Sequence, residues 1–138
     1  MTRNEFISQV GSGVAVLLIP SCLGGLAGCS SNGAVPSAPT NVDFTLDVST
    51  GTLSNNGGFL LKDGLIVARS TSGSYLAVSA ACTHEGTTIQ YLGSTNSFRC
   101  PNHGATFNST GQVTNGPATK SLSKYNTTLT GTSLRVFS

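Results

Sequence analysis

Two short segments of this 138-residue chain each place a histidine close behind a cysteine. The first reads CTHEG from Cys82 to Gly86, the second reads CPNHG from Cys100 to Gly104, and fifteen residues separate His84 from Cys100. Thiolate sulfur and imidazole nitrogen are the donor atoms of zinc sites and of iron–sulfur centres with mixed ligands. We therefore expect two opposing loops, each closed by its glycine, that hold one metal centre with two sulfur and two nitrogen ligands.

Two other interpretations of these residues remain open. A disulfide between Cys82 and Cys100 is plausible in an exported protein, but it would leave both histidines unexplained. A structural zinc site would have suitable donor atoms, although such sites usually use C-x2-4-C and H-x3-5-H pairs, and a C-x-H pair is unusual. Neither alternative is excluded by the residues alone.

The rest of the chain offers few reactive side chains. It contains four cysteines, two histidines, one methionine and no tryptophan, and only 9% of its residues are charged. Its net charge of +2 comes from seven basic and five acidic residues, which is too small and too dispersed for a nucleic-acid-binding surface. The length allows one domain of ordinary size and excludes a large multidomain enzyme.

The first 28 residues are typical of an export signal. Arg3 lies in a short polar start, an apolar run VAVLLI follows at 14–19, and LAGC ends at Cys29. This order indicates a secretory signal, and the apolar run is shorter than the roughly 20 residues of a membrane-spanning helix. LAGC resembles the lipobox of bacterial lipoproteins, which implies cleavage before Cys29 and a lipid on this cysteine. Cys22 would be lost with the signal.

The segment after Cys29 has the composition of a tether. Ser30 to Thr40 (SSNGAVPSAPT) shows no apolar periodicity and contains two prolines, which favours a flexible link. The chain from Cys29 onward keeps about 110 residues, enough for a single core. We therefore expect a lipoprotein signal peptide at 1–28, a lipidated flexible tether at 29–41 and one domain at 42–138.

The elements that must position the two loops have the pattern of short strands. Apolar and polar side chains alternate from Val42 to Val48, as in a half-buried strand. Asp63-Gly64 predicts a hairpin turn between apolar runs at 59–62 and 65–68. Further short runs lie at 75–78, 88–92, 97–99, 105–107, 125–129 and 134–137. Without any helical stripe, the domain is predicted to be all-β, a small antiparallel sandwich or barrel of seven to ten strands.

At the two loops the sequence resembles the Rieske family, whose C-x-H and C-x2-H loops bind a 2Fe–2S cluster. The matching segments are CTHEG at 82–86 and CPNHGATF at 100–107, and the likeness continues at Gly116-Pro117-Ala118. The resemblance implies a Rieske-type β fold with a cluster-binding subdomain of two loops. It further implies that Cys82 and Cys100 bind one iron, that His84 and His103 bind the other, and that Gly116 and Pro117 belong to a loop covering the cluster.

The resemblance also implies one-electron transfer. Two thiolates balance the two positive charges of an oxidised 2Fe–2S core and the imidazoles add none, so the centre accepts an electron more readily than one with four thiolates. High-potential members carry Ser and Tyr donors at the positions of Ala105 and Phe107, and a loop disulfide at the positions of Thr87 and Asn102. Glu85 adds negative charge beside a ligand. These departures imply a low-potential, ferredoxin-like carrier.

We therefore expect an electron carrier at the bacterial envelope, facing the periplasm or exterior and attached to the membrane by the lipid on Cys29. Its donor and acceptor would be redox partner proteins, with no nucleic acid involved. The alternative is the Rieske subunit of a stable oxidoreductase complex of the quinol-oxidising or molybdenum-enzyme type. Catalysis on a bound substrate is not expected, because a mononuclear iron site would need further histidines and both are already used.

Overall fold

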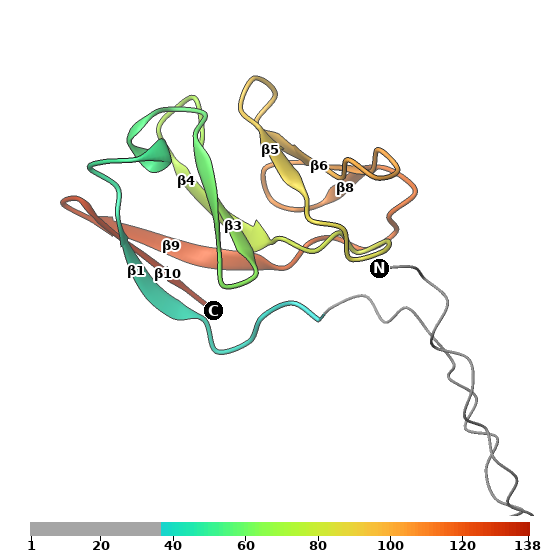
Figure 1. Cartoon of the computed structure of the whole chain (residues 1–138), viewed down its shortest axis with the longest axis horizontal. Helices are drawn as coiled ribbons and strands as arrows, with labels where there is room; N and C mark the ends of the chain where they lie inside the picture. Colours follow the sequence, from blue (N-terminus) through green and yellow to red (C-terminus); the bar gives the residue numbers. More distant parts are fainter. Residues whose placement is uncertain (1–36) are drawn as a thin grey trace, which may run out of the picture. The chain divides into compact units, whose positions relative to one another are not determined.

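A computed structural model describes residues 37–138 of the chain (Figure 1). Within this range the chain forms ten strands and one short 3-10 turn, which confirms the all-β prediction. No helix in the described range is long and apolar enough to cross a membrane. The predicted signal peptide, Cys29 and most of the predicted tether lie outside the described residues.

The strands form two antiparallel sheets. The larger sheet has six strands in the order β1-β10-β9-β4-β3-β2, and the smaller has four in the order β5-β6-β7-β8. Figure 1 shows the smaller sheet, in yellow and orange, next to β3, which contacts β5. The elements are β1 (Asp43–Asp47), η1 (Thr52–Ser54), β2 (Phe59–Lys62), β3 (Leu65–Arg69), β4 (Tyr75–Ser79), β5 (Gln90–Leu92), β6 (Ser97–Arg99), β7 (Thr106–Phe107), β8 (Val113–Asn115), β9 (Lys124–Thr130) and β10 (Ser133–Phe137).

Tight turns join the strands where the sequence predicts them. Between β2 and β3, Asp63 and Gly64 have φ angles of 50° and 79°, the left-handed conformation that a two-residue hairpin turn requires. Gly131, with a φ angle of 62°, lies in the turn between β9 and β10. The sequence does not predict β8, because Val113-Thr114-Asn115 has one apolar residue and no alternation. It becomes a strand by pairing with β7.

β3 lies inside the core and is buried on both faces. Successive side chains of a strand point to opposite faces, so Leu65 and Val67 enter one apolar cluster while Ile66 and Ala68 enter another. The second cluster combines side chains from both sheets and therefore fills the space between them. It contains both loop cysteines; its buried members are Ile66, Ala68, Val78, Cys82, Ile89, Tyr91, Phe98, Cys100, Ala105, Phe107, Ala118 and Leu122.

The chain is held against the larger sheet just before β1. The hydroxyl of the buried Tyr125 in β9 donates a hydrogen bond of 2.7 Å to the carbonyl oxygen of Pro39. Burial raises the pKa of this hydroxyl, which keeps it protonated and able to donate. The chain is thus fixed at Pro39, inside the segment predicted as tether.

The two cysteine–histidine segments are loops with the same backbone closure. In the first loop, which follows β4, the amide of Gly86 donates to the carbonyl of Cys82 at 2.7 Å. In the second, between β6 and β7, the amide of Gly104 donates to the carbonyl of Cys100 at 3.1 Å. Both glycines are in the left-handed region, with φ angles of 74° and 77°. Both loops are therefore compact turns, closed by the same backbone hydrogen bond and a left-handed glycine.

Replacing Gly104 tests whether its left-handed backbone is what the second loop requires. A Cβ at Gly104 would meet nothing within 4 Å, so the penalty of Gly104→Ala is conformational and not steric. We expect a loss of about 1 kcal/mol and a melting temperature lower by roughly 4–8 °C. Gly104→Asn is the matched control and should lose less, because asparagine adopts this conformation more readily. Equal melting temperatures for the two variants, measured by circular dichroism, would contradict this explanation.

Candidate metal centre

Cys82 and Cys100 lie at the buried end of the two loops. Their exposed fractions are 0% and 2%, and the two thiols are not joined by a disulfide. Both belong to the apolar cluster between the sheets, where thiols have few partners other than each other. The structure thus brings together two sulfur donors from segments that are separated in the sequence by the β5–β6 hairpin.

Without a nearby cation, the surroundings of Cys82 favour its protonated thiol over the thiolate. Burial raises the pKa of its thiol, and the nearby Cys100 thiol raises it further, because a thiolate is poorly solvated there. Backbone N–H groups of His84 and Glu85 act in the opposite direction by hydrogen bonding to the sulfur. These amides would remain to stabilise a thiolate whose charge is balanced by iron.

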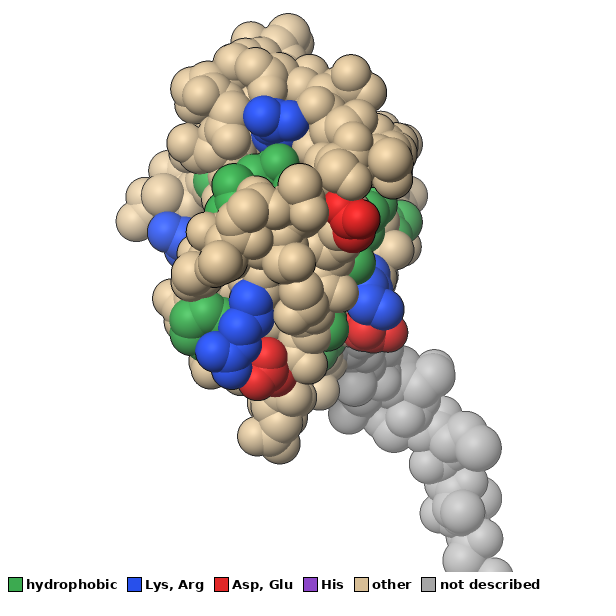
Figure 2. All heavy atoms as spheres, turned by 90° about the vertical axis from the view of Figure 1, so that its left-hand side faces the viewer, with side chains coloured by type: hydrophobic (Ala, Val, Ile, Leu, Met, Phe, Trp, Pro, Cys, Tyr) green, Lys and Arg blue, Asp and Glu red, His purple; other side chains and the backbone are tan. Residues whose placement is uncertain are grey.

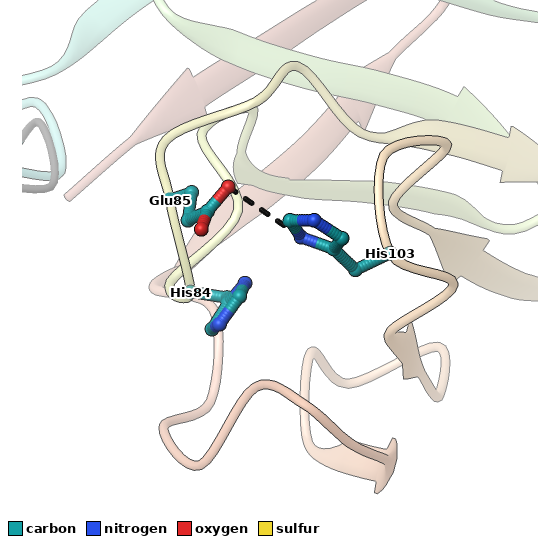
Figure 3. Close-up of side chains that lie close together, drawn as sticks. All are labelled: His84, Glu85 and His103. Carbon is teal, nitrogen blue, oxygen red and sulfur yellow. Dashed lines mark ion pairs between the residues drawn. The ribbon is translucent and has the colours of Figure 1, made fainter.

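His84 and His103 lie at the exposed tips of the same loops. Their ring centroids are 5.1 Å apart and the rings meet edge to face at 81° (Figure 3). The His103 side chain is 45% exposed, and His84 is partly exposed. The site therefore has a direction, with sulfur donors at its buried end and nitrogen donors at its solvent end.

Glu85, in the first loop, contacts the second loop at the surface. Its Oε2 lies 3.4 Å from Nδ1 of His103 and accepts a hydrogen bond of 3.0 Å from Nδ2 of Asn102. Potential ligand atoms of His84, Glu85 and His103 all lie within 4.8 Å of one another. In the sequence Glu85 adjoins His84. No sequence pattern indicates its contact with His103, because Glu85 and His103 are far apart along the chain.

A third segment lies against the first loop. The Thr83 hydroxyl donates a hydrogen bond of 2.6 Å to the carbonyl oxygen of Lys120, and Ala118 is buried in the same apolar cluster as the cysteines. The preceding Gly116-Pro117 peptide bond is cis, and both residues are exposed. The residues after Pro117 are thus the part of the predicted third loop that contacts the first loop. The sequence does not indicate the role of Thr83 in this contact.

Two further residues of the predicted cluster environment are fully buried. Ala105 follows the second loop and Phe107 lies on β7, and each has an exposed fraction of 0% in the cluster that holds the cysteines. Neither side chain can donate a hydrogen bond to a sulfur. These two members of the cluster that holds the sulfur donors are therefore apolar.

The donor set fits an iron–sulfur centre with mixed ligands. Two sulfur donors lie together in an apolar interior, two nitrogen donors lie together at the surface, and each loop supplies one of each. A binuclear cluster has two irons, so the two cysteines would hold one iron and the two histidines the other.

Comparisons with known proteins identify the family. Residues 39–126 match the model of the family described as Rieske [2Fe-2S] domain. The cytochrome b6-f complex iron-sulfur subunit of Chlorobaculum thiosulfatiphilum is 32% identical over 76 residues, which are 55% of this chain and 42% of that protein. Subunit 1 of the same name from Nostoc sp. is 44% identical over 45 residues, 33% of this chain and 25% of that protein. The chain thus spans less than half the length of these curated relatives.

Solved structures agree with the family match. The plasma membrane Rieske protein PetC3 from Synechocystis PCC 6803 superposes with a TM-score of 0.51 and 32% identity, covering 59% of this chain and 85% of that chain. The ferredoxin of carbazole 1,9a-dioxygenase from Nocardioides aromaticivorans IC177 has a TM-score of 0.54 and 24% identity, covering 73% and 98%, and shows the same fold. The predicted fold is confirmed, and the chain belongs to the Rieske [2Fe-2S] domain family, whose cofactor is a 2Fe–2S cluster.

Proposed function

We propose that this protein is a one-electron carrier whose cluster is held by Cys82 and Cys100 on one iron and by His84 and His103 on the other. The observation that carries the proposal is the arrangement of the donors, with free buried thiols beneath two paired imidazoles at the surface. When bound, the cluster supplies a reversible one-electron couple. The protein's own residues orient the cluster, shield it from water and provide the point at which the electron leaves.

The two imidazole rings are the point at which the electron passes to a partner. The cysteine end is enclosed by the apolar side chains of both sheets, whereas the His103 side chain is 45% exposed and His84 lies beside it. A partner protein can therefore come closest to the cluster at these two rings. Transfer of a single electron needs such an approach but no pocket for a substrate.

The surface favours transient encounters over a permanent complex. Among residues 37–138, the large apolar side chains that are exposed are Leu61 and Leu129, which lie on strands separated by two others in the sheet. Charged side chains are scattered over the face in Figure 2, and two ion pairs, Lys62–Asp63 and Arg135–Asp43, combine opposite signs. A stable subunit interface would bury a broader apolar area.

A stable complex is the second candidate, because two of the relatives are named as cytochrome b6-f complex subunits. Co-purification from the native membrane separates the two proposals. A carrier leaves the column alone, whereas a complex subunit elutes with its partners at fixed stoichiometry.

The surroundings of the sulfur donors favour a low potential. Ala105 and Phe107 offer no hydroxyl that could withdraw electron density from the cluster, and the Glu85 carboxylate lies against the His103 ring. Both features disfavour the added negative charge of the reduced state.

We expect the purified protein to contain equal amounts of iron and acid-labile sulfide and to be reduced reversibly at about −150 to 0 mV, the lower part of the range of Rieske centres. Protein-film voltammetry measures this midpoint. A midpoint above about +150 mV would refute the low-potential assignment, and protein without iron would refute the electron-carrier function.

A hydroxyl added beside the sulfur donors tests the cause of that potential. Ala105→Ser should raise the midpoint by about 60 mV, the one-electron equivalent of about 1.4 kcal/mol for a hydrogen bond to a charged group. Ala77→Ser is the matched control, since it adds the same hydroxyl to the other apolar cluster. It should lower stability and leave the midpoint unchanged.

We also propose that the domain is anchored to the envelope by a lipid on Cys29. The LAGC sequence before and at Cys29 supports this, as does the point at Pro39 where the chain is fixed to the sheet, some ten residues later. Those intervening residues suffice to hold the folded domain clear of a membrane surface.

Replacing Cys29 tests the anchor. The chain from native membranes should begin at Cys29 and carry a lipid, whereas Cys29→Ser should stay unprocessed and retain residues 1–28. Cys22→Ser is the matched control and should be processed and lipidated normally. Intact-mass spectrometry of the three proteins distinguishes these outcomes, and normal processing of Cys29→Ser would exclude Cys29 as the modified residue.

A further inference from the structure

Each loop is closed on itself, but little holds one loop to the other. Within the first loop the amide of Gly86 bonds to Cys82, and within the second the amide of Gly104 bonds to Cys100. Across residues 37–138, the one hydrogen bond between the loops at 82–86 and 100–104 runs from Nδ2 of Asn102 to Oε2 of Glu85, at 3.0 Å.

The same carboxylate oxygen also places a negative charge beside His103, the proposed ligand from the second loop. Oε2 of Glu85 lies 3.4 Å from Nδ1 of His103 (Figure 3). The hydrogen bond from Asn102 to the same oxygen therefore holds a negative charge against this ring. The Glu85 side chain is 51% exposed. Among the described residues, Asn102 is the one that donates a hydrogen bond to this carboxylate.

The loops need such a connection because of how they share the ligands. Each loop contributes one sulfur and one nitrogen, so a relative movement of the loops shifts one ligand on each iron. The first loop is fastened on another side by Thr83, whose hydroxyl bonds to the carbonyl of Lys120. The second loop has no corresponding side-chain bond to that segment among the described residues.

We propose that Glu85 and Asn102 form a clasp between the loops that positions His103 and sets the potential of the centre. The Asn102 amide holds the carboxylate in place, and the carboxylate keeps the second loop against the first. Its charge beside His103 then disfavours reduction. The inference rests on the proposed electron-carrier function, because it concerns the cluster that this function requires.

The test separates the charge of the clasp from its hydrogen bond, using cluster-loaded protein at one pH and salt concentration. Glu85→Gln removes the charge but keeps an oxygen that can accept from Asn102. Asn102→Ala keeps the charge but removes the donor. Asp47→Asn, at the end of β1, is the matched control, because it removes an exposed carboxylate outside the loops while retaining an acceptor for the Ser49 amide. The midpoint potential and the rate of cluster bleaching in chelator are measured for each.

We expect Glu85→Gln to raise the midpoint and to leave the bleaching rate within twofold of the wild type. Asn102→Ala should raise the midpoint as well, although it changes no charge, because the released carboxylate moves away from His103. It should also bleach about fivefold faster, the effect of one lost hydrogen bond. Asp47→Asn should change neither quantity.

An unchanged midpoint in Asn102→Ala would overturn the clasp, since a purely structural side chain could alter bleaching but would not hold a charge in place. Faster bleaching in Glu85→Gln than in Asn102→Ala would overturn it too. Both results leave the proposed function standing, because that function fails separately, when the wild-type protein contains no iron or shows no reversible reduction.

Discussion

The burial of two unpaired thiols between the sheets is the constraint on which the rest of the structure depends. Cys82 lies in the connection from β4 of the larger sheet to β5 of the smaller, and Cys100 lies in a loop within the smaller sheet. They meet in the apolar cluster where Ile66 and Val78 of the larger sheet pack with Phe98 of the smaller. A thiolate in such an interior is unfavourable without a nearby cation. Because these ligands must lose their protons to bind iron and come together only in the folded chain, metal binding would be coupled to folding.

The same arrangement makes the two ends of the site different. Closing each loop within a few residues places its histidine on the opposite end from its cysteine, so a buried sulfur end and an exposed nitrogen end arise from local backbone geometry at Gly86 and Gly104. In the proposed centre, two imidazole ligands at the exposed end would make electron uptake easier than four thiolates would, and a carboxylate beside one imidazole would oppose it.

Features that depend on neighbouring residues were predictable from the sequence, and those that depend on distant pairs were not. The turn at Asp63-Gly64 and the glycine-closed loops follow from local preferences, and the C-x-H and C-x2-H spacings predict the ligands that we propose. The bond from Thr83 to Lys120 and the bond from Asn102 to Glu85 join segments 37 and 17 residues apart. Polar residues at such separations have many possible partners, and only the folded chain selects one.

The central claim is that like ligands are paired, two sulfur atoms on one iron and two nitrogen atoms on the other. Mössbauer spectroscopy of the reduced protein enriched in ⁵⁷Fe tests this most directly, because it reports the valence and ligands of each iron separately. The account predicts two unequal irons, a ferric one with the parameters of all-sulfur coordination and a ferrous one shifted by its nitrogen ligands. Two irons with all-sulfur parameters, or spectra showing one sulfur-and-nitrogen environment shared by both, would contradict it.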